Sequence, residues 1–196
     1  MHIPPFDNKN MAIIEAGNSD VPLNYFNIVK LKKNEQFVSH VTGYETCLVP
    51  ATGSIDINVG NKSFKNIGGR GTDVWDGEPE CVYIPTGQEC EIKCTSETTE
   101  IFIAGAKYDK VLVPFEVRNH ELDLIQYGSD DTKTHRKIKH ILGQKQAGRV
   151  GRLLVSELFT VGAGGWSGFP SHKHDTDRLP LETRHDETYN FRFRPN

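Results

Sequence analysis

Two histidines near the C-terminus have a spacing that lets both side chains reach one metal ion. His172 and His174 lie two residues apart, and in a β-strand the side chains at i and i+2 point to the same face. Alternation resumes at Glu187 and continues through aromatic residues to Phe193. If the two segments pair as antiparallel strands, Glu187 lies beside the imidazoles and the aromatic side chains fill a barrel. The pattern therefore predicts a site for a divalent metal with ligands His172, His174 and Glu187, and it does not choose among Zn²⁺, Mn²⁺, Fe²⁺, Co²⁺ and Ni²⁺.

Two other residues compete for a place in this site. His185 lies two positions before Glu187 and shares its face if the strand extends that far. Glu182 is a weaker rival to Glu187 as the acidic ligand. The alternative without a metal is a solvated loop that happens to be rich in histidine.

The elements that must position these side chains have the pattern of short β-strands. Residues 53–59 alternate strictly and place three aliphatic side chains on one face. Residues 60–62 predict a tight turn, and Cys81–Ile84 reads as a strand that Pro85 ends. Strands of this length at close spacing, broken by Gly and Pro, favour a barrel or sandwich over a βαβ fold.

A second series of strands follows a polar stretch at residues 128–136, which reads as a linker or exposed loop. Residues 138–142 and 152–160 are the candidate strands, and 161–165 form a glycine-rich turn. A convincing helical period is absent from the sequence pattern. The sequence therefore predicts an all-β protein with two groups of strands.

Composition narrows the function classes. The chain has 196 residues, 36% of them hydrophobic, and a formal net charge of -3, which argues against a basic surface for nucleic acid. Its sequence contains no run of the roughly 20 apolar residues that span a bilayer, and a secretory signal is not expected because no basic patch precedes a long apolar stretch near the N-terminus. The four cysteines are expected to be idle thiols in a reducing compartment rather than zinc ligands or a disulfide. We therefore expect a soluble, cytoplasmic protein that binds neither nucleic acid nor a membrane.

A Gly…His-x-His…Glu arrangement of this kind resembles the first metal motif of the cupin superfamily. The stretch is more closely similar to the 5-deoxy-glucuronate isomerase family of inositol catabolism, to which the 5-keto-4-deoxyuronate isomerases of pectin breakdown are related. The segments that carry this similarity near the metal motif are Gly165-Trp166-Ser167, Pro170-Ser171-His172-Lys173-His174-Asp175 and Glu187-Thr188-Tyr189. Further segments that resemble the family are Gly68-Gly69-Arg70-Gly71, Val74-Trp75, Val82-Tyr83-Ile84-Pro85, Thr134-His135-Arg136 and Ile141-Leu142.

The resemblance implies a bicupin fold, with an N-terminal cupin barrel over residues 1–127 and a partial C-terminal barrel over 128–196 that carries the metal motif. It implies a divalent metal cofactor, with Zn²⁺ or Mn²⁺ favoured, held by His172, His174 and Glu187. The reaction would be the aldose–ketose isomerisation of 5-deoxy-D-glucuronate, a small sugar acid, to 2-deoxy-5-keto-D-gluconate. Arg70, held between glycines, is expected to brace its own barrel, and the first barrel is a candidate for contacts in a homo-oligomer.

Members of this family continue past the position of Asn196. Their further strands supply a fourth ligand, a histidine, and complete the second barrel. This chain ends shortly after the segment that carries Glu187. We therefore expect either a fragment or a naturally shortened member, with an open sheet edge that needs a partner or a cover.

Isomerisation needs a Lewis acid, a base within reach of the carbon acid, and groups that hold the substrate. Tyr189 could orient the substrate or relay a proton, with barrel packing as its alternative role. Lys173 and Arg178 could pair with the substrate carboxylate, or they could be solvated charges on a loop. Competing functions are a non-catalytic cupin that binds a sugar acid, and another metal-dependent cupin enzyme such as a uronate isomerase, a dioxygenase or an oxalate-degrading relative.

Overall fold

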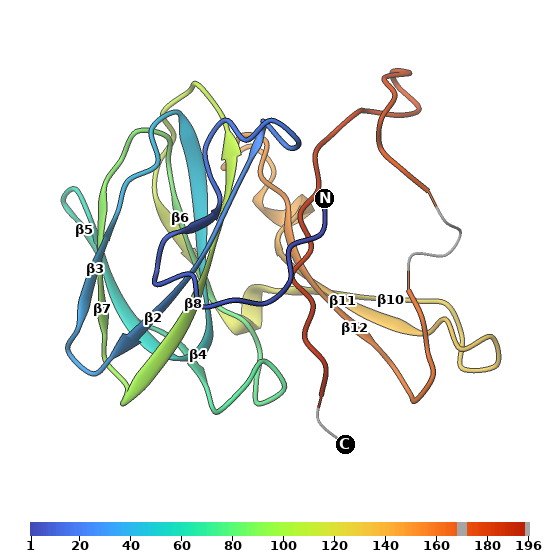
Figure 1. Cartoon of the computed structure of the whole chain (residues 1–196), viewed down its shortest axis with the longest axis horizontal. Coiled ribbons are helices and arrows are strands. Elements are labelled where there is room, and N and C mark those ends of the chain that lie inside the picture. Colours follow the sequence, from blue (N-terminus) through green and yellow to red (C-terminus); the bar gives the residue numbers. More distant parts are fainter. Residues whose placement is uncertain (168–171, 195–196) are drawn as a thin grey trace.

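The protein is built almost entirely of β-strands in a computed structural model that describes residues 1–167 and 172–194 (Figure 1). The strands are β1 (Ala12–Ile14), β2 (Asn24–Lys32), β3 (Gln36–Ser39), β4 (Tyr44–Val59), β5 (Lys62–Arg70), β6 (Cys81–Ile84), β7 (Cys90–Cys94), β8 (Thr98–Lys107), β9 (Phe115–Val117), β10 (Asp123–Tyr127), β11 (Arg136–Leu142) and β12 (Val155–Thr160). Two short 3-10 helices, η1 (Asn119–Glu121) and η2 (Gln144–Gln146), connect strands of the second half. Over the described ranges, the structure contains no helix with the length and apolar character needed to cross a membrane.

The first nine strands form a two-layered sandwich, and β4 belongs to both layers. The first half of β4 pairs with β6 and β8, and its second half pairs with β5 and β7. The strand changes layers near Gly53, which has a φ of 66°. A Cβ on Gly53 would lie 2.2 Å from the carbonyl oxygen of Thr98, so both the backbone conformation and the space require glycine here. This antiparallel sandwich confirms the predicted all-β class.

Side chains that alternate along β4 fill the interior of the sandwich. Ile55, Ile57 and Val59 are almost completely buried, as their period of two predicts. The turn after them consists of Gly60 and Asn61, because Val59 pairs directly with Lys62 at the start of β5. The strand pattern of the first half of the sequence is therefore confirmed.

A second, three-stranded antiparallel sheet has the order β10-β11-β12 and packs beside the sandwich (Figure 1). Ile141 and Leu142 of β11, and Leu153 just before β12, join a core cluster with Cys47 and Tyr83 of the sandwich. All four residues of β6 are buried, because their two faces contact different clusters. The division of the chain at residues 127 and 128 stays a prediction, and the second sheet begins at Asp123.

A fully buried carboxylate joins the two sheets. Glu45 of β4 accepts a hydrogen bond of 2.5 Å from the hydroxyl of Tyr83 in β6. It also accepts backbone N–H bonds from Gly151 (2.8 Å), Arg152 (2.5 Å) and Leu153 (2.8 Å), just before β12. Burial and the neighbouring Glu45 raise the pKa of Tyr83 well above its usual value. The carboxylate therefore satisfies four donors at once, three of them from the backbone that leads into the second sheet.

A buried ion pair makes a second connection. Arg70, at the end of β5, donates two hydrogen bonds to the carboxylate of Glu157 in β12, at 2.8 and 2.6 Å. Close by, the ring of Trp75 packs edge-on against Phe159 at a centroid distance of 5.4 Å. The expectation that Arg70 braces its own barrel is therefore wrong. Its partner is distant in sequence, so the local glycine pattern carries no information about it.

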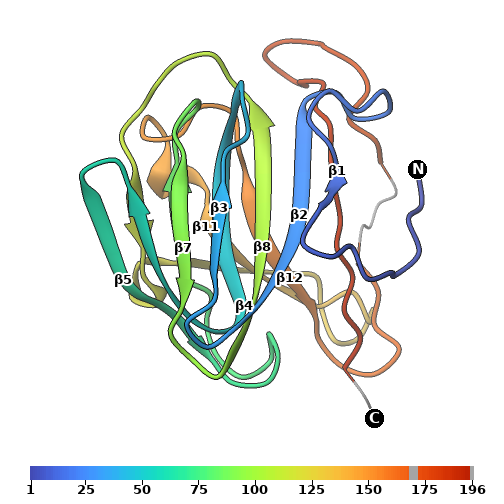
Figure 2. The ribbon, with the colours of Figure 1, turned by 60° about the vertical axis from the view of Figure 1, so that its left-hand side comes forward.

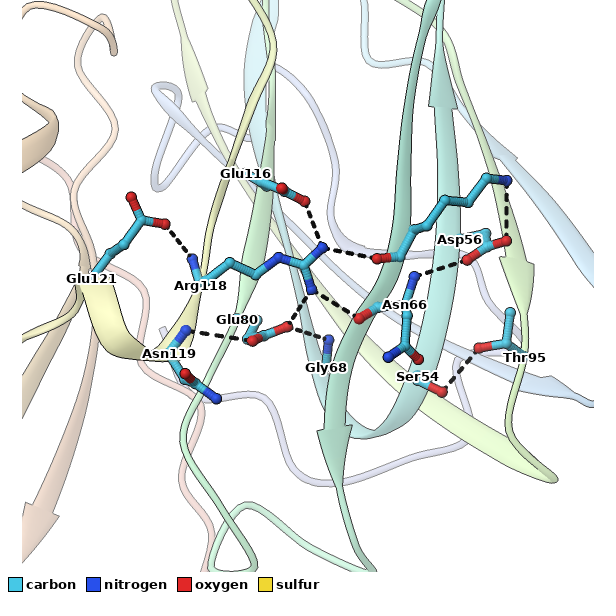
Figure 3. A network of polar contacts seen from close by, with 11 residues as sticks. Ser54, Asp56, Asn66, Gly68, Glu80, Thr95, Glu116, Arg118, Asn119 and Glu121 are labelled. Carbon is cyan, nitrogen blue, oxygen red and sulfur yellow. Dashed lines mark hydrogen bonds and ion pairs between the residues drawn. The ribbon is translucent and has the colours of Figure 1, made fainter.

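A second arginine network stabilises the edge of the sandwich (Figure 3). Arg118 donates hydrogen bonds to the carbonyl oxygens of Lys65 and Asn66 in β5, and to the carboxylates of Glu80 and Glu116. Among the other contacts shown, the backbone N–H of Gly68 donates a hydrogen bond of 3.0 Å to the buried Glu80. The network ties β5 to the segment around β9.

The four cysteines are buried free thiols. Burial raises the pKa of Cys90 to about 12, so this thiol stays protonated and unreactive at neutral pH.

Gly68 and Gly69 provide a matched pair for testing the packing at this edge. Both have a positive φ, 101° and 115°. A Cβ on Gly68 would lie 2.6 Å from the carbonyl oxygen of Gly53 and 2.9 Å from the Cβ of Pro50, whereas a Cβ on Gly69 has open space. Gly69→Ala is expected to lower the free energy of unfolding by about 1–2 kcal/mol through backbone strain alone, and Gly68→Ala by clearly more, as measured by urea denaturation. Equal losses in the two variants would contradict the close approach at Gly68.

Candidate metal centre

The residues of the predicted metal motif lie on a segment that leaves the second sheet, loops away from it and returns along the sandwich (Figures 1 and 2). Residues 172–194 contain no β-strand, and their one bridge joins Arg178 to Glu182. The predicted pairing of two strands around His172–His174 and Glu187–Phe193 is therefore wrong. The two stretches meet instead through one backbone hydrogen bond, from His185 N–H to the carbonyl oxygen of His174 at 3.1 Å. Pro170 and Ser171 of the motif lie outside the described residues.

The aromatic side chains after Glu187 do not fill a barrel. Tyr189, Phe191 and Phe193 are 65%, 73% and 86% exposed. Their alternation is compatible with any extended backbone, because a period of two follows from extension and not from pairing with another strand. The sequence pattern could therefore predict the extended conformation but not what covers its apolar face.

Three potential metal ligands converge where the two stretches meet. One ligand atom each from His174, His185 and Glu187 lies within 4.8 Å of the others. The Nε2 atoms of His174 and His185 are 3.9 and 3.5 Å from the same carboxylate oxygen of Glu187. The two imidazoles stack with their ring centroids 4.0 Å apart. Two nitrogens and a carboxylate oxygen are a donor set that Zn²⁺, Mn²⁺ and related divalent ions accept, so these residues fit a metal ion.

His172 borders this group. Its ring centroid lies 4.9 Å from that of His174, in an edge-to-face arrangement. Of the three ligands predicted from the sequence, the structure thus brings His174 and Glu187 together and places His172 beside them. The third member of the group is His185, for which the sequence signal was its spacing of two from Glu187.

The hydrogen bond of His185 fixes which of its nitrogens is free. The Nδ1 atom lies 3.1 Å from the carbonyl oxygen of Thr183, and a carbonyl can only accept. Nδ1 therefore donates in this contact, and Nε2, on the Glu187 side, is the nitrogen available to a metal. Imidazoles that bind metals commonly donate their second nitrogen to a carbonyl or carboxylate in this way.

Tyr189 adds a proton donor next to the group. Partial burial raises the pKa of its hydroxyl, as do the charge of Glu187 and a hydrogen bond to it. The hydroxyl is therefore protonated at neutral pH and can donate a hydrogen bond or a proton.

An open pocket of ≈ 610 Å³ lies against the imidazoles of His172, His174 and His185, and its wall includes Lys173 and Arg178. Lys173 Nζ is 2.5 Å from the carboxylate of Asp175, and Arg178 donates two hydrogen bonds to Glu182. Both cations predicted to bind a substrate carboxylate thus face the pocket while they pair within their own loop. Glu182, the rival acidic ligand, is engaged by Arg178.

The two-layered antiparallel sandwich is a cupin-like architecture. A crystal structure of an IolB-like protein from Salmonella typhimurium LT2 has the same fold, with a TM-score of 0.72 and 24% sequence identity over 82% of this chain and 59% of that one. The family model described as KduI/IolB matches residues 3–196. The chain belongs to the KduI/IolB family.

Similar curated proteins carry the name 5-deoxy-glucuronate isomerase. The protein of this name from Listeria innocua is 30% identical over 185 residues, which cover 93% of this chain and 65% of the relative. That from Shouchella clausii is 32% identical over 171 residues, or 86% of this chain and 61% of the relative. The chain thus spans somewhat less than two thirds of the length of these relatives.

Proposed function

We propose that this chain carries the metal centre of an aldose–ketose isomerase that converts 5-deoxy-D-glucuronate to 2-deoxy-5-keto-D-gluconate. The observation that carries the proposal is the convergence of His174, His185 and Glu187 beside an open pocket, in a chain whose family relatives bear the isomerase name. A small sugar acid is the substrate class, and the metal is a divalent ion such as Zn²⁺ or Mn²⁺.

His174 and Glu187 are the central ligands of the proposed site. They belong both to the set expected from the sequence, with His172, and to the group that lies within 4.8 Å, with His185. We assign all four side chains to the centre, because the ring of His172 adjoins that of His174. Three imidazoles and one carboxylate would hold the ion through four donors and could leave positions on it for substrate oxygens.

Isomerisation moves a carbonyl to the adjacent carbon, so a proton must leave a carbon next to a carbonyl and return to its neighbour. The bound ion supplies Lewis-acid stabilisation of the negative charge that develops on oxygen. Tyr189, protonated and hydrogen-bonded to Glu187, holds a proton at the edge of the centre and can deliver it to substrate oxygen. This role requires the exposure that the structure gives to the tyrosine ring.

Lys173 and Arg178 are the proposed partners of the substrate carboxylate. Both line the pocket, and their present partners, Asp175 and Glu182, belong to the same loop. Ion pairs this exposed are weak because water screens them, so a sugar carboxylate can exchange for them. Arginine can bind such a carboxylate through two parallel hydrogen bonds.

The test is an isomerase assay on the purified chain. Protein stripped with a chelator is mixed with 5-deoxy-D-glucuronate, with and without Mn²⁺ or Zn²⁺, and the sugar is followed by NMR. We expect product only after metal is added. Metal binding without turnover would instead support the non-catalytic cupin, and turnover of 5-keto-4-deoxyuronate alone would support a uronate isomerase.

Replacing the proposed proton donor should separate chemistry from metal binding. Tyr189→Phe removes the hydroxyl that bonds to Glu187 and leaves the ring in place. We expect kcat to fall about 100-fold, which is typical of the loss of a general acid, while metal content stays at the wild-type level. Unchanged kcat would assign the tyrosine to packing and remove it from the mechanism.

A further inference from the structure

The segment that carries Glu187 is held against the first sandwich by side chains on both sides of that residue. The carboxylate of Asp186 accepts a hydrogen bond of 2.9 Å from the backbone N–H of Leu23. Thr188 accepts one of 2.9 Å from the side chain of Asn24 at the start of β2. Figure 2 shows this segment running beside β1 and β2. The segment on both sides of Glu187 is thus attached to the sandwich.

The strongest of these attachments is Arg192. One of its terminal nitrogens lies 2.6 Å from the carboxylate of Asp73, in the loop after β5, and the other forms an ion pair with Glu100 of β8. Its guanidinium also lies 5.2 Å from the ring centroid of Phe102. The side chain is only 25% exposed. An arginine between two carboxylates and an aromatic ring is held more firmly than one in a single surface ion pair.

These attachments determine which way Glu187 points. In an extended backbone, alternate side chains point to opposite sides. Residues 186, 188 and 192 bond to the sandwich, so Glu187 and Tyr189 face the other way, where Glu187 meets the histidines. Residues 186–194 pair with no neighbouring strand, so side-chain contacts, rather than a ladder of backbone bonds, set this register. A slip by one residue would turn Glu187 away from the imidazoles.

We propose that Arg192 is a positioning residue for the metal centre, acting by fixing the register of the segment that presents Glu187. This role rests on the proposed metal centre. It gives the first sandwich a part in metal binding, because Asp73 and Glu100 hold the arginine. The side chains that hold the arginine are Asp73 and Glu100 of the sandwich and its loop, with Phe102 beside them.

The test uses Co²⁺ as the probe, because its visible absorption reports both occupancy and ligand set. Arg192→Met keeps the aliphatic stem and removes the charge. We expect its Kd for Co²⁺ to rise about 10- to 100-fold, as for other residues that orient a ligand, with a changed cobalt spectrum because the carboxylate no longer binds in the same way. Arg192→Lys should recover part of the affinity, and circular dichroism should show that both variants remain folded.

Lys30→Met is the matched control. Lys30 also faces Glu100, at 3.6 Å, but lies on β2 of the sandwich itself, so its loss should leave the Kd and the spectrum unchanged. Glu100→Gln combined with Asp73→Asn should reproduce the Arg192→Met effect, and adding Arg192→Met to that pair should weaken binding no further.

Two outcomes overturn different conclusions. Wild-type protein that binds Co²⁺, with an Arg192→Met variant of equal Kd and spectrum, would refute the positioning role and leave the metal centre intact. Wild-type protein that binds no Co²⁺ would refute the metal centre and this role with it.

Discussion

Glu45→Gln is expected to lower the free energy of unfolding by about 2–6 kcal/mol, because two hydrogen-bond donors lose their acceptor at a cost of about 1–3 kcal/mol each. The side chain keeps its shape, but an NH₂ group replaces one oxygen. Each oxygen of Glu45 accepts two hydrogen bonds, so the new group must face two donors. Glu45 and Tyr83 are completely buried, so water cannot easily replace the lost acceptor. Urea denaturation followed by fluorescence measures the loss.

Two comparisons show whether the effect belongs to the network. Glu97→Gln changes a carboxylate whose side chain is 83% exposed and should leave stability unchanged. Tyr83→Phe removes one donor and leaves the three backbone bonds, so we expect a smaller loss of about 1 kcal/mol. If Glu45→Gln were as stable as Glu97→Gln, the buried carboxylate would not be what joins the sheets.

His174→Ala should lower the affinity for Zn²⁺ or Mn²⁺ by about 100-fold or more, and activity should fall with it. His174 belongs to both ligand sets and adjoins His172, His185 and Glu187, so no neighbouring side chain can substitute for it without moving. Metal content after equilibrium dialysis, measured by mass spectrometry, is the readout. Unchanged stoichiometry in this variant would contradict the assignment of the centre.

The flanking histidines distinguish the two ligand sets. We expect His172→Ala and His185→Ala each to lower affinity, because both imidazoles belong to the proposed centre. If His185→Ala binds metal with wild-type affinity, the ligands are His172, His174 and Glu187. If His172→Ala does so, the ligands are His174, His185 and Glu187. His135→Ala is the control, since His135 bonds to Asp130 and Gln126.

The sequence predicted the first sandwich well because its signals are local. The alternation of Ile55, Ile57 and Val59 and the turn at Gly60 involve neighbouring residues, and the structure confirms both. The C-terminal segment has equally clear alternation, yet it forms no strand. A strand needs a partner edge with free backbone groups, and the residues that supply such an edge cannot be identified from alternation.

The sequence predicted the types of side chain in the candidate metal site better than it predicted which residues would form the site. Histidine and glutamate at close spacing indicated a metal donor set, and the structure gathers His174 with Glu187. The third member, His185, depends on how the loop between residues 174 and 185 folds back. The anchors of the site, such as Arg192 with Asp73, lie more than a hundred residues apart, so nothing in the local sequence reveals them.

The double-sided burial of β6 has a consequence for how this architecture can be inherited. The sandwich is not expected to fold as an independent domain. Removing the second sheet and the residues that lead into it would expose Tyr83 and Cys81 to water and leave Glu45 without its backbone donors. A recombination event that separates the two sheets would therefore produce a sandwich with an exposed apolar surface that is prone to aggregation. The pair is expected to pass between genes as one unit.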